Sequence, residues 1–323
     1  MSGTSPPPVD ILPMLATLVH DVPAGDEWAY EMKWDGVRAL MLVREGAVRA
    51  TSRAGRDITG GYPEFAALGT ELAGTDVLLD GEIVALDERG RPSFQLLQRR
   101  MHVRDATSVR VLQQEVPVAY MIFDLLWLDG SRTTALPYHE RRRVLEALDL
   151  RSTFWQTPPA SRENGKAALA TSRELGLEGI VAKRVDSQYE PGRRSPAWRK
   201  VKHDLRQELV IGGWSPGKGW RSGRVGALLL GYYDDAGSLR YAGKVGTGFT
   251  EEELDRLDAL LAPLEQDANP FTGTGVPRVA RFVEPSQVAE VRFAEWTEAG
   301  RIRQPAYLGL RDDKRPEDVV RET

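Results

Sequence analysis

The chain of 323 residues contains 41% hydrophobic and 28% charged residues, carries a net charge of −4 and has no cysteine. This length and composition are typical of a soluble globular protein with two domains. The absence of cysteine excludes disulfides and cysteine-ligated zinc. No apolar run is long enough to span a bilayer, so we expect a cytoplasmic protein without a membrane partner. Residues 1–10 lack the regions of a signal peptide and are expected to form a flexible leader.

The first two thirds of the chain alternates between strand and helix patterns. Apolar residues, alternating or continuous, predict strands at 39–43, 47–51 and 77–86. Helical spacing predicts helices at 63–72 and 166–175, and the start of another at 94–98. The Arg44–Gly46 segment between the first two strands predicts a hairpin, and Gly176 is a common residue at the end of a helix.

A change of pattern near residues 203–206 predicts a boundary between one domain over residues 11–204 and a second over residues 205–323. Beyond it, short strands are predicted at 208–213, 226–233, 239–245 and 288–296, with an amphipathic helix at 251–261. A five-stranded Greek-key barrel of the oligonucleotide-binding (OB) type fits this pattern. From the pattern alone, an SH3-like barrel or a β-sandwich fragment fits nearly as well.

Arginine and lysine cluster in four segments although the net charge is acidic. The clusters lie at residues 99–104, 141–143, 193–202 and 218–224. Arg141–Arg143 is interpreted as the solvated face of a helix that runs to Leu150. The last two clusters contain or adjoin Trp198, Trp214 and Trp220, which suits a groove along a phosphate backbone. The acidic balance argues against a protein that coats DNA tightly and passively.

Lys33 stands two residues before Asp35 and three before Gly36, in a segment that continues to Arg38. A deprotonated lysine amine can attack a phosphorus or carbonyl centre. Near it, Asp35 could hold a metal and Arg38 could donate to a phosphate. Taken alone, a lysine and an aspartate two residues apart on one face of a strand more commonly form an exposed ion pair.

Glu82 lies in the predicted strand at 77–86 and is expected to point inward. A buried carboxylate is costly unless a cation or hydrogen-bond donors meet it. On this strand alone, a functional carboxylate and an ordinary structural ion pair are equally open interpretations.

Seven segments resemble, in order, the motifs of the covalent nucleotidyltransferases, which include DNA ligases, RNA ligases and mRNA-capping enzymes. They are Lys33–Arg38, Ser52–Arg53, Asp80–Val84, Tyr120–Asp124, Glu178–Lys183, Trp198–Lys202 and Arg311–Lys314. Each segment is weak evidence, but their order over nearly the whole chain makes the resemblance strong. It implies an α+β protein in which an adenylation (nucleotidyltransferase) domain of antiparallel sheets and helices precedes an OB domain.

The resemblance also implies a role for each matching residue. Lys33 would be the catalytic nucleophile that takes AMP from ATP as a phosphoramidate. Mg²⁺ or Mn²⁺ would be held by Glu82, Glu178 and Asp35. The residues that would contact the nucleotide or the nucleic-acid phosphate are Glu31, Arg38, Arg53, Glu82, Phe123, Glu178, Lys200, Lys202, Arg311 and Lys314.

Several of these implied roles have a plainer alternative. Phe123 would stack on adenine, although an aromatic residue in an apolar strand more commonly packs in the core. Glu31 would accept a hydrogen bond from the adenine amine and favour ATP over GTP, unless it is an exposed carboxylate at a strand edge. Arg311 and Lys314 belong to the second domain, so they would reach ATP only if that domain closes, with a hinge near residues 203–207.

Within the superfamily, the tail segments Ala289–Thr297 and Arg301–Arg311 are most similar to the ATP-dependent ligase module of bacterial end-joining DNA ligases. This resemblance implies sealing of 3′-OH/5′-phosphate breaks in nicked or broken duplex DNA. It also implies a Ku-type end-binding partner, a monomer and a place in the bacterial nucleoid.

Other activities within and outside the superfamily remain as alternatives. NAD-dependent bacterial ligases carry a four-cysteine zinc module, which a chain without cysteine lacks. An RNA ligase, a capping-type guanylyltransferase and a non-catalytic nucleic-acid-binding scaffold stay open. Many end-joining modules are fused to polymerase and phosphoesterase domains, for which 323 residues leave no room, so a stand-alone ligase or an excised module is expected.

Overall fold

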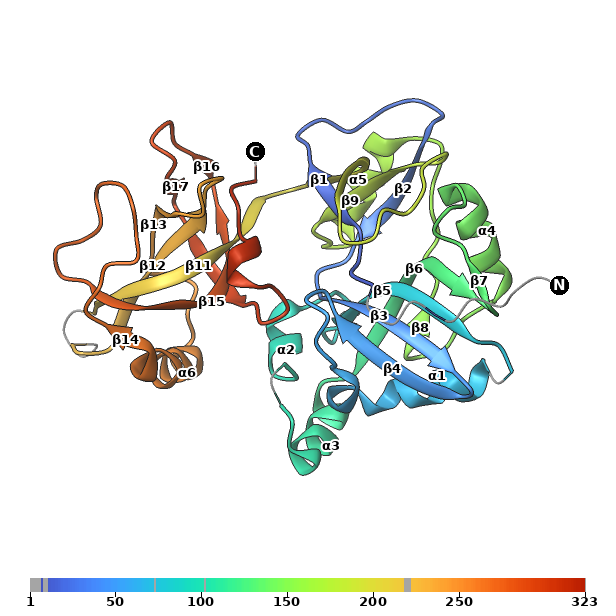
Figure 1. Cartoon of the computed structure of the whole chain (residues 1–323), viewed down its shortest axis with the longest axis horizontal. Helices are drawn as coiled ribbons and strands as arrows, with labels where there is room; N and C mark the ends of the chain where they lie inside the picture. The colour runs from blue at the N-terminus through green and yellow to red at the C-terminus, as the bar shows by residue number, and fades with distance from the viewer. Residues whose placement is uncertain (1–6, 8–10, 73, 102, 218–221, 323) are drawn as a thin grey trace. The chain divides into compact units, whose positions relative to one another are not determined.

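The computed structural model describes residues 7, 11–72, 74–101, 103–217 and 222–322. The predicted leader at residues 1–10 lies outside the described residues except for Pro7, and so does most of the basic cluster at 218–224. The chain forms two compact units, the first ending at His203 and the second beginning at Asp204 (Figure 1). In the described part of the chain, no helix is long and apolar enough to cross a membrane.

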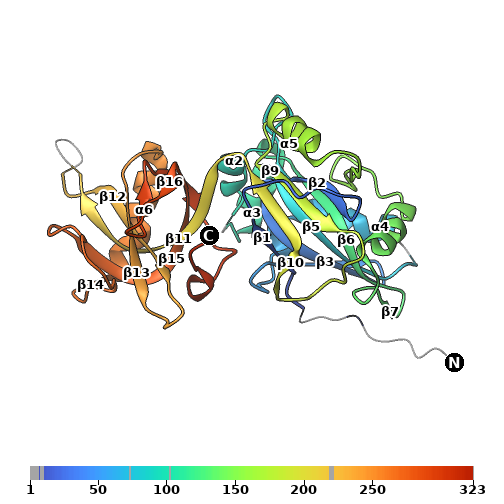
Figure 2. The ribbon, with the colours of Figure 1, turned by 90° about the horizontal axis from the view of Figure 1, so that it is seen from above.

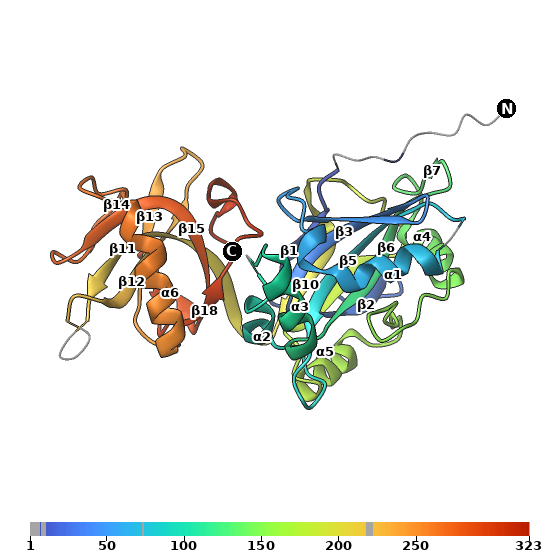
Figure 3. The same ribbon diagram turned by 90° about the horizontal axis from the view of Figure 1, so that it is seen from below.

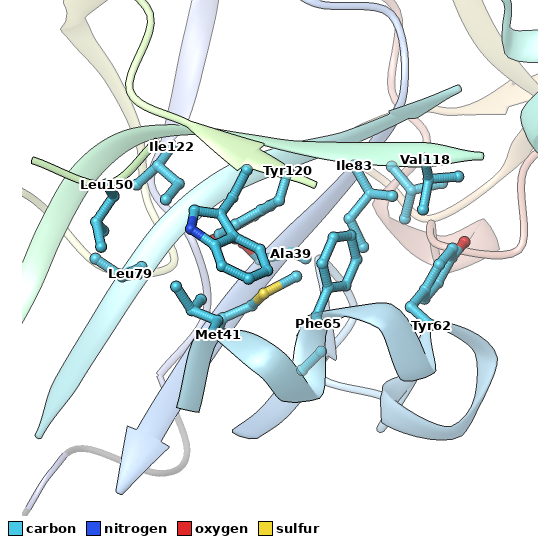
Figure 4. Close-up of a cluster of buried hydrophobic side chains, with 14 of the residues drawn as sticks. Ala39, Met41, Tyr62, Phe65, Leu79, Ile83, Val118, Tyr120, Ile122 and Leu150 are labelled. Carbon is cyan, nitrogen blue, oxygen red and sulfur yellow. The ribbon is translucent and has the colours of Figure 1, made fainter. Parts of the chain in front are cut away.

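The first unit contains a six-stranded sheet in the order β4-β3-β5-β6-β7, with β8 paired to β6. The strands are β3 (Val37–Arg44), β4 (Ala47–Ser52), β5 (Val77–Ala85), β6 (Val118–Leu128), β7 (Ser131–Arg132) and β8 (Trp155–Gln156). The predicted hairpin is confirmed, because β3 and β4 pair in antiparallel register. On one face of this sheet, Met41, Leu79 and Tyr120 pack in a buried cluster with Phe65 (Figure 4).

Short helices cover that apolar face. The predicted helix at 63–72 forms as a 3₁₀ turn, η2 (Pro63–Phe65), followed by α1 (Ala66–Glu71), which lies along β3 and β4 (Figure 3). Further helices come between strands of this sheet in the chain. They are η1 (Thr59–Gly61), α2 (Phe94–Gln98), α3 (Ala106–Glu115) and α4 (Tyr138–Ala147).

The interpretation of Arg141–Arg143 as a solvated face was wrong. Arg141 and Arg142 are both buried on α4, and only Arg143 is exposed. The Arg141 guanidinium donates two hydrogen bonds, of 2.7 and 2.9 Å, to the carboxylate of Asp124 on β6. A buried guanidinium is tolerated when a carboxylate meets it in this forked geometry. The helix also ends at Ala147, three residues before the predicted end.

A second, four-stranded sheet in the first unit has the order β1-β10-β9-β2. Its strands are β1 (Leu15–Leu18), β2 (Trp28–Lys33), β9 (Gly179–Arg184) and β10 (Arg194–Lys202). Helix α5 (Gly165–Glu174) covers one face and lies beside β2 and β9 (Figure 2). From the other face, Trp198 shares a buried cluster with Leu40 and Leu78 of the six-stranded sheet. The two sheets therefore pack face to face.

The second unit is a curved sheet with the strand order β13-β12-β11-β15-β14, and β18 also pairs with β15. Its strands are β11 (Leu205–Pro216), β12 (Val225–Tyr233), β13 (Leu239–Val245), β14 (Glu265–Gln266), β15 (Arg281–Phe293) and β18 (Ala306–Leu310), beside a small hairpin of β16 (Glu295–Trp296) and β17 (Ile302–Arg303). The helices are α6 (Glu251–Leu261), η4 (Ala262–Leu264) and η5 (Pro316–Asp318).

The bounds predicted for β13 and α6 are confirmed residue for residue, whereas β11 and β15 are longer than predicted. Leu254, Leu257 and Leu261 of α6 belong to the buried core of this unit. The helix lies beside the strands of the sheet (Figure 3). The α+β class and the OB-type second domain agree with the fold that was predicted from the sequence.

Candidate active site

Lys33, Gly179 and Lys202 lie side by side at the ends of three neighbouring strands. In the β2–β9 pair Lys33 is opposite Gly179, and in the β9–β10 pair Gly179 is opposite Lys202. Glu178 immediately precedes Gly179, so its carboxylate comes between the two lysines. The Lys33 ammonium donates to Oε2 of Glu178, and the Lys202 Nζ lies 2.8 Å from Oε1. Three predicted site residues are thus brought together, although 145 positions separate Lys33 from Glu178 in the sequence.

The Glu178 carboxylate is held in its ionised form. Burial by itself would raise the pKa of Glu178, but the attraction of Lys202 and Lys33 and their hydrogen bonds lower it well below its usual range. The Lys33 side chain keeps 22% of its exposure, whereas that of Glu178 keeps 3%. The amine is therefore accessible to an incoming phosphate while its partner is not.

Gly179 allows this close approach of three strands. Its φ is +153°, and a Cβ at this position would lie 2.0 Å from the carbonyl oxygen of Val201 on β10. No side chain fits there without moving the backbone of one strand. The glycine therefore places Glu178 between the two lysines.

Glu31 is buried, so the alternative of an exposed edge carboxylate is wrong. It lies two residues before Lys33 on β2 and hence on the same face of the sheet. Its Oε2 lies 2.7 Å from the Lys183 ammonium, and its Oε1 accepts a 2.5 Å hydrogen bond from the Tyr138 hydroxyl. Arg142 adds an Nη1 at 3.5 Å from Oε1.

Lys183, Tyr138 and Arg142 were not predicted as site residues. Lys183 falls inside a matched motif and could have been found there by its alternation with Val181 along the strand. Tyr138 and Arg142 belong to a helix outside every matched motif, and no signal in the sequence points to them.

Arg38 forms a forked ion pair with Asp80, with both nitrogen–oxygen distances at 2.6 Å. Burial alone would lower the pKa of Arg38, but the attraction of Asp80 raises it above its usual value, so the guanidinium stays charged. The central carbon (Cζ) of the Arg38 guanidinium lies 4.5 Å from the centre of the Phe123 ring. Glu82 is half-buried and stands opposite Arg38 in the β3–β5 pair.

Phe123 and Trp198 form an aromatic wall on facing sheets, with ring centres 6.4 Å apart in an edge-to-face arrangement. The Lys183 ammonium lies 4.6 Å from the first ring and 4.2 Å from the second. Phe123 is half-buried rather than fully enclosed. A half-buried ring keeps a surface on which a planar base can stack.

Three other predicted residues take the following places. Asp35 lies between β2 and β3, Arg53 directly follows β4, and Lys200 alternates with Lys202 on one face of β10. Among the described residues no three histidine or acidic side chains gather into a group that could hold a metal ion. An all-protein metal cage is therefore not formed here, whereas a Mg²⁺ ion needs few carboxylates because it keeps waters and binds substrate phosphates.

Arg311 and Lys314 lie in the second unit and are buried in ion pairs there. Arg311 donates to both carboxylate oxygens of Asp313, at 2.8 and 2.9 Å, and to Glu290 at 2.8 Å. Lys314 donates to Glu208 at 3.1 Å. Glu208 and Glu290 are directly opposite each other on β11 and β15, so the two cations neutralise a pair of like charges.

Comparison with known proteins agrees with this geometry. Residues 13–202 match the family described as ATP dependent DNA ligase domain, and residues 221–314 match the ATP dependent DNA ligase C terminal region. Fold and site therefore define a covalent nucleotidyltransferase domain followed by an OB-type domain. The chain belongs to the family of ATP-dependent DNA ligases, which confirms the expected family, fold class and ligase activity.

The chain is related to the ligase module of end-joining proteins. It is 46% identical over 322 residues to the multifunctional non-homologous end joining DNA repair protein LigD of Mycobacterium tuberculosis, covering 97% of this chain and 40% of that protein. It is 39% identical over 329 residues to LigD of Pseudomonas aeruginosa, covering 99% and 38%. The solved structure of a mycobacterial DNA ligase D complexed with ATP and MES has a TM-score of 0.68 at 44% identity, covering 97% of this chain and 99% of that one. The chain spans about two fifths of the length of these curated relatives.

Proposed function

We propose that the chain seals 3′-OH/5′-phosphate breaks in duplex DNA during bacterial end joining, through an AMP carried on Lys33. The observation that supports this most is the contact of Lys33 and Lys202 with one buried carboxylate at the ends of three paired strands. It places an accessible amine beside a second cation that can bind a phosphate. The matching order of the motifs and the relatives' printed activity support the same reaction.

In the first step, the Lys33 amine attacks the α-phosphorus of ATP, a nitrogen–phosphorus bond forms, and pyrophosphate leaves. The amine must first lose a proton, because an ammonium has no lone pair. Lys200 and Lys202 would bind the α-phosphate oxygens and offset the charge that develops on them. Holding the reactants in line contributes most of the acceleration in such transfers.

In the second step, an oxygen of the 5′-phosphate at the break attacks the phosphoramidate and takes AMP from Lys33. In the third step, the 3′-hydroxyl attacks this activated 5′-phosphate, AMP leaves, and a phosphodiester remains. Arg53 would meet the DNA phosphate, and Arg38 would contact the nucleotide or DNA as it turns from Asp80.

Within this site, Phe123 would stack on the adenine and Glu31 would accept a hydrogen bond from its amine. Glu82, Glu178 and Asp35 would hold Mg²⁺ or Mn²⁺, which supplies Lewis-acid stabilisation of phosphate charge when bound. One or two of these carboxylates at a time suffice for an ion that keeps part of its hydration shell and binds substrate phosphates.

Arg311 and Lys314 would orient the leaving pyrophosphate. They belong to the second unit, so this role requires that unit to close over the nucleotide in the first step and to move away when DNA enters. A hinge near residues 203–207 would allow both states. This role also requires Arg311 to leave Asp313 or Glu290 in part, because its guanidinium is shared between them.

The names of the relatives support a proposal about the cellular setting. LigD proteins are named for non-homologous end joining. We therefore propose that this chain acts as a monomer on nicked or broken duplex DNA in the bacterial nucleoid, beside a Ku-type end-binding protein.

Intact mass after incubation with ATP and Mg²⁺ tests the proposal. We expect a gain of one AMP from ATP, none from GTP or NAD, and none in Lys33→Ala. The adduct should then be consumed by nicked duplex DNA and yield a sealed strand. An adduct that persists in Lys33→Ala would show that the nucleophile is misassigned. Consumption by nicked RNA but not by DNA would overturn the substrate.

A further inference from the structure

The buried carboxylate of Glu31 is held by groups from two different elements. Lys183 approaches Oε2 from β9, whereas Tyr138 and Arg142 approach Oε1 from α4. Tyr138 and Arg142 are four residues apart and so lie on the same face of the helix. All four side chains are buried. A carboxylate held from both sides cannot rotate freely about its terminal bond.

The Tyr138 hydroxyl is a fixed donor in this arrangement. Its single proton points to Glu31 at 2.5 Å. Burial and the neighbouring Glu31 raise the pKa of Tyr138 well above its usual value, so the hydroxyl does not ionise near neutral pH. A carboxylate can accept about four hydrogen bonds. After Tyr138 and Lys183, Glu31 therefore keeps acceptor capacity for a ligand.

Two nitrogens of the Arg142 guanidinium bind groups other than Glu31, and the third faces the Glu31 carboxylate. Its Nε donates to Glu146 at 2.7 Å, and its Nη2 donates to the carbonyl oxygen of Pro158. Nη1 is buried and has no hydrogen-bond partner among the described residues, and 3.5 Å separates it from Glu31. A buried N–H without an acceptor is costly, typically by about 1–3 kcal/mol in proteins. The guanidinium therefore turns a further donor, and no acceptor, toward Glu31.

We infer that Tyr138 is a positioning residue for base specificity, which acts by fixing Glu31 as an acceptor toward the purine 6-position. The inference rests on the proposed function, since it needs ATP to bind with its base toward Glu31. A carboxylate fixed as an acceptor favours the 6-amino group of adenine, which donates, over the 6-oxo group of guanine, which accepts. Lys183 and Arg142 face this carboxylate with donors, and the Tyr138 hydroxyl sets its direction.

The test compares two nucleotides in each variant. Lys33 adduct formation is timed with ATP and with purine riboside triphosphate, which lacks the 6-amino group, and the preference is the ratio of the two values of kcat/KM. The variants are Tyr138→Phe and, as matched control, Tyr30→Phe. Tyr30 is a buried tyrosine on β2 that clusters with Ala168 of α5, and its hydroxyl donates to the Pro23 carbonyl oxygen at 2.7 Å.

We expect the wild type to prefer ATP by at least tenfold and Tyr138→Phe to lower this preference about tenfold, while Tyr30→Phe leaves it unchanged. A ratio taken on one preparation is insensitive to the fraction of folded enzyme, so partial unfolding cannot imitate the result. Equal slowing of both nucleotides by Tyr138→Phe would overturn the inference. Glu31→Gln should shift the preference toward ITP, because its amide can donate to a 6-oxo group.

These outcomes also separate the inference from the proposed function. No adduct with ATP in the wild type would overturn the proposed function. An adduct whose preference does not respond to Tyr138→Phe would leave the proposed function intact and remove the positioning role.

Discussion

Lys33, Glu178 and Lys202 form a group around one buried carboxylate, and its members depend on one another. Two cations share a single carboxylate that solvent barely reaches. Each cation repels the other, and Glu178 is the group that makes their proximity tolerable. Removal of the carboxylate therefore leaves two like charges together at the site.

We predict that Glu178→Gln destabilises the protein by about 3 kcal/mol at neutral pH, because it removes the buried anion that two neighbouring cations share. The pKa of Glu178 is lowered in the folded state, so its contribution is present above the unfolded pKa of about 4.3 and is lost as pH falls below it. In urea unfolding, the difference in the free energy of unfolding between wild type and Glu178→Gln should therefore be constant from pH 7 to 5. Below pH ~4 this difference should become smaller.

The exposed Glu88→Gln serves as the control and should change stability by less than about 0.5 kcal/mol. A gap between wild type and Glu178→Gln that widens toward low pH would contradict the assigned charge state.

We predict that Gly179→Ala destabilises the protein by about 3 kcal/mol and slows adduct formation, since the added Cβ collides with the Val201 carbonyl oxygen. Gly90→Ala is the matched control. Gly90 also has a positive φ, of +73°, but nothing lies within 4 Å of its added Cβ. Its cost should be only about 1 kcal/mol. Similar thermal shifts in both variants would show that crowding at Gly179 is relieved without cost.

Helix α4 illustrates how an element is placed by buried charged contacts in addition to its apolar side. Arg141 joins it to β6 through Asp124, and Tyr138 and Arg142 join it to β2 through Glu31. The same helix thus closes the core and contacts the candidate base-recognition residue. Displacement of α4 should consequently affect both stability and nucleotide choice.

We predict that Asp124→Asn destabilises the first unit by about 3 kcal/mol, because it leaves the buried Arg141 guanidinium without its anion. Asp186→Asn breaks a similar forked pair with Arg184, but that pair lies at the surface, with 46% and 62% of the side chains exposed. Its loss should cost less than about 1 kcal/mol. Comparable unfolding midpoints for the two variants in urea would contradict the structural role of α4.

At the scale of the whole molecule, the proposed reaction needs different units for different steps. Lys33 lies in the first unit, while Arg311 and Lys314 lie in the second. Pyrophosphate leaves only in the first step, so residues that orient it have no corresponding task when the strand is sealed.

We predict that Arg311→Ala slows adduct formation about 100-fold, the usual range for loss of a charge-stabilising group, and slows sealing of pre-adenylated nicked DNA much less. Both rates are measured on one preparation, because Arg311→Ala also removes ion pairs with Asp313 and Glu290 and lowers the stability of the second unit. Exposed Arg315→Ala, which loses a surface pair with Asp318, is the control. Equal losses in both steps would remove the argument for closure.

The order of the motifs, the family and much of the local structure could be predicted from the amino-acid sequence. The bounds of β13 and α6 follow from residue periodicity, which is a local property of the chain. Lys33 could be singled out because its neighbours Asp35 and Gly36 are adjacent in sequence. Which charged side chains are buried, and which residues they contact, is visible only in the tertiary structure. Arg142 and Tyr138 contact Glu31 across more than 100 positions, and burial of a charge depends on a partner that local periodicity cannot supply.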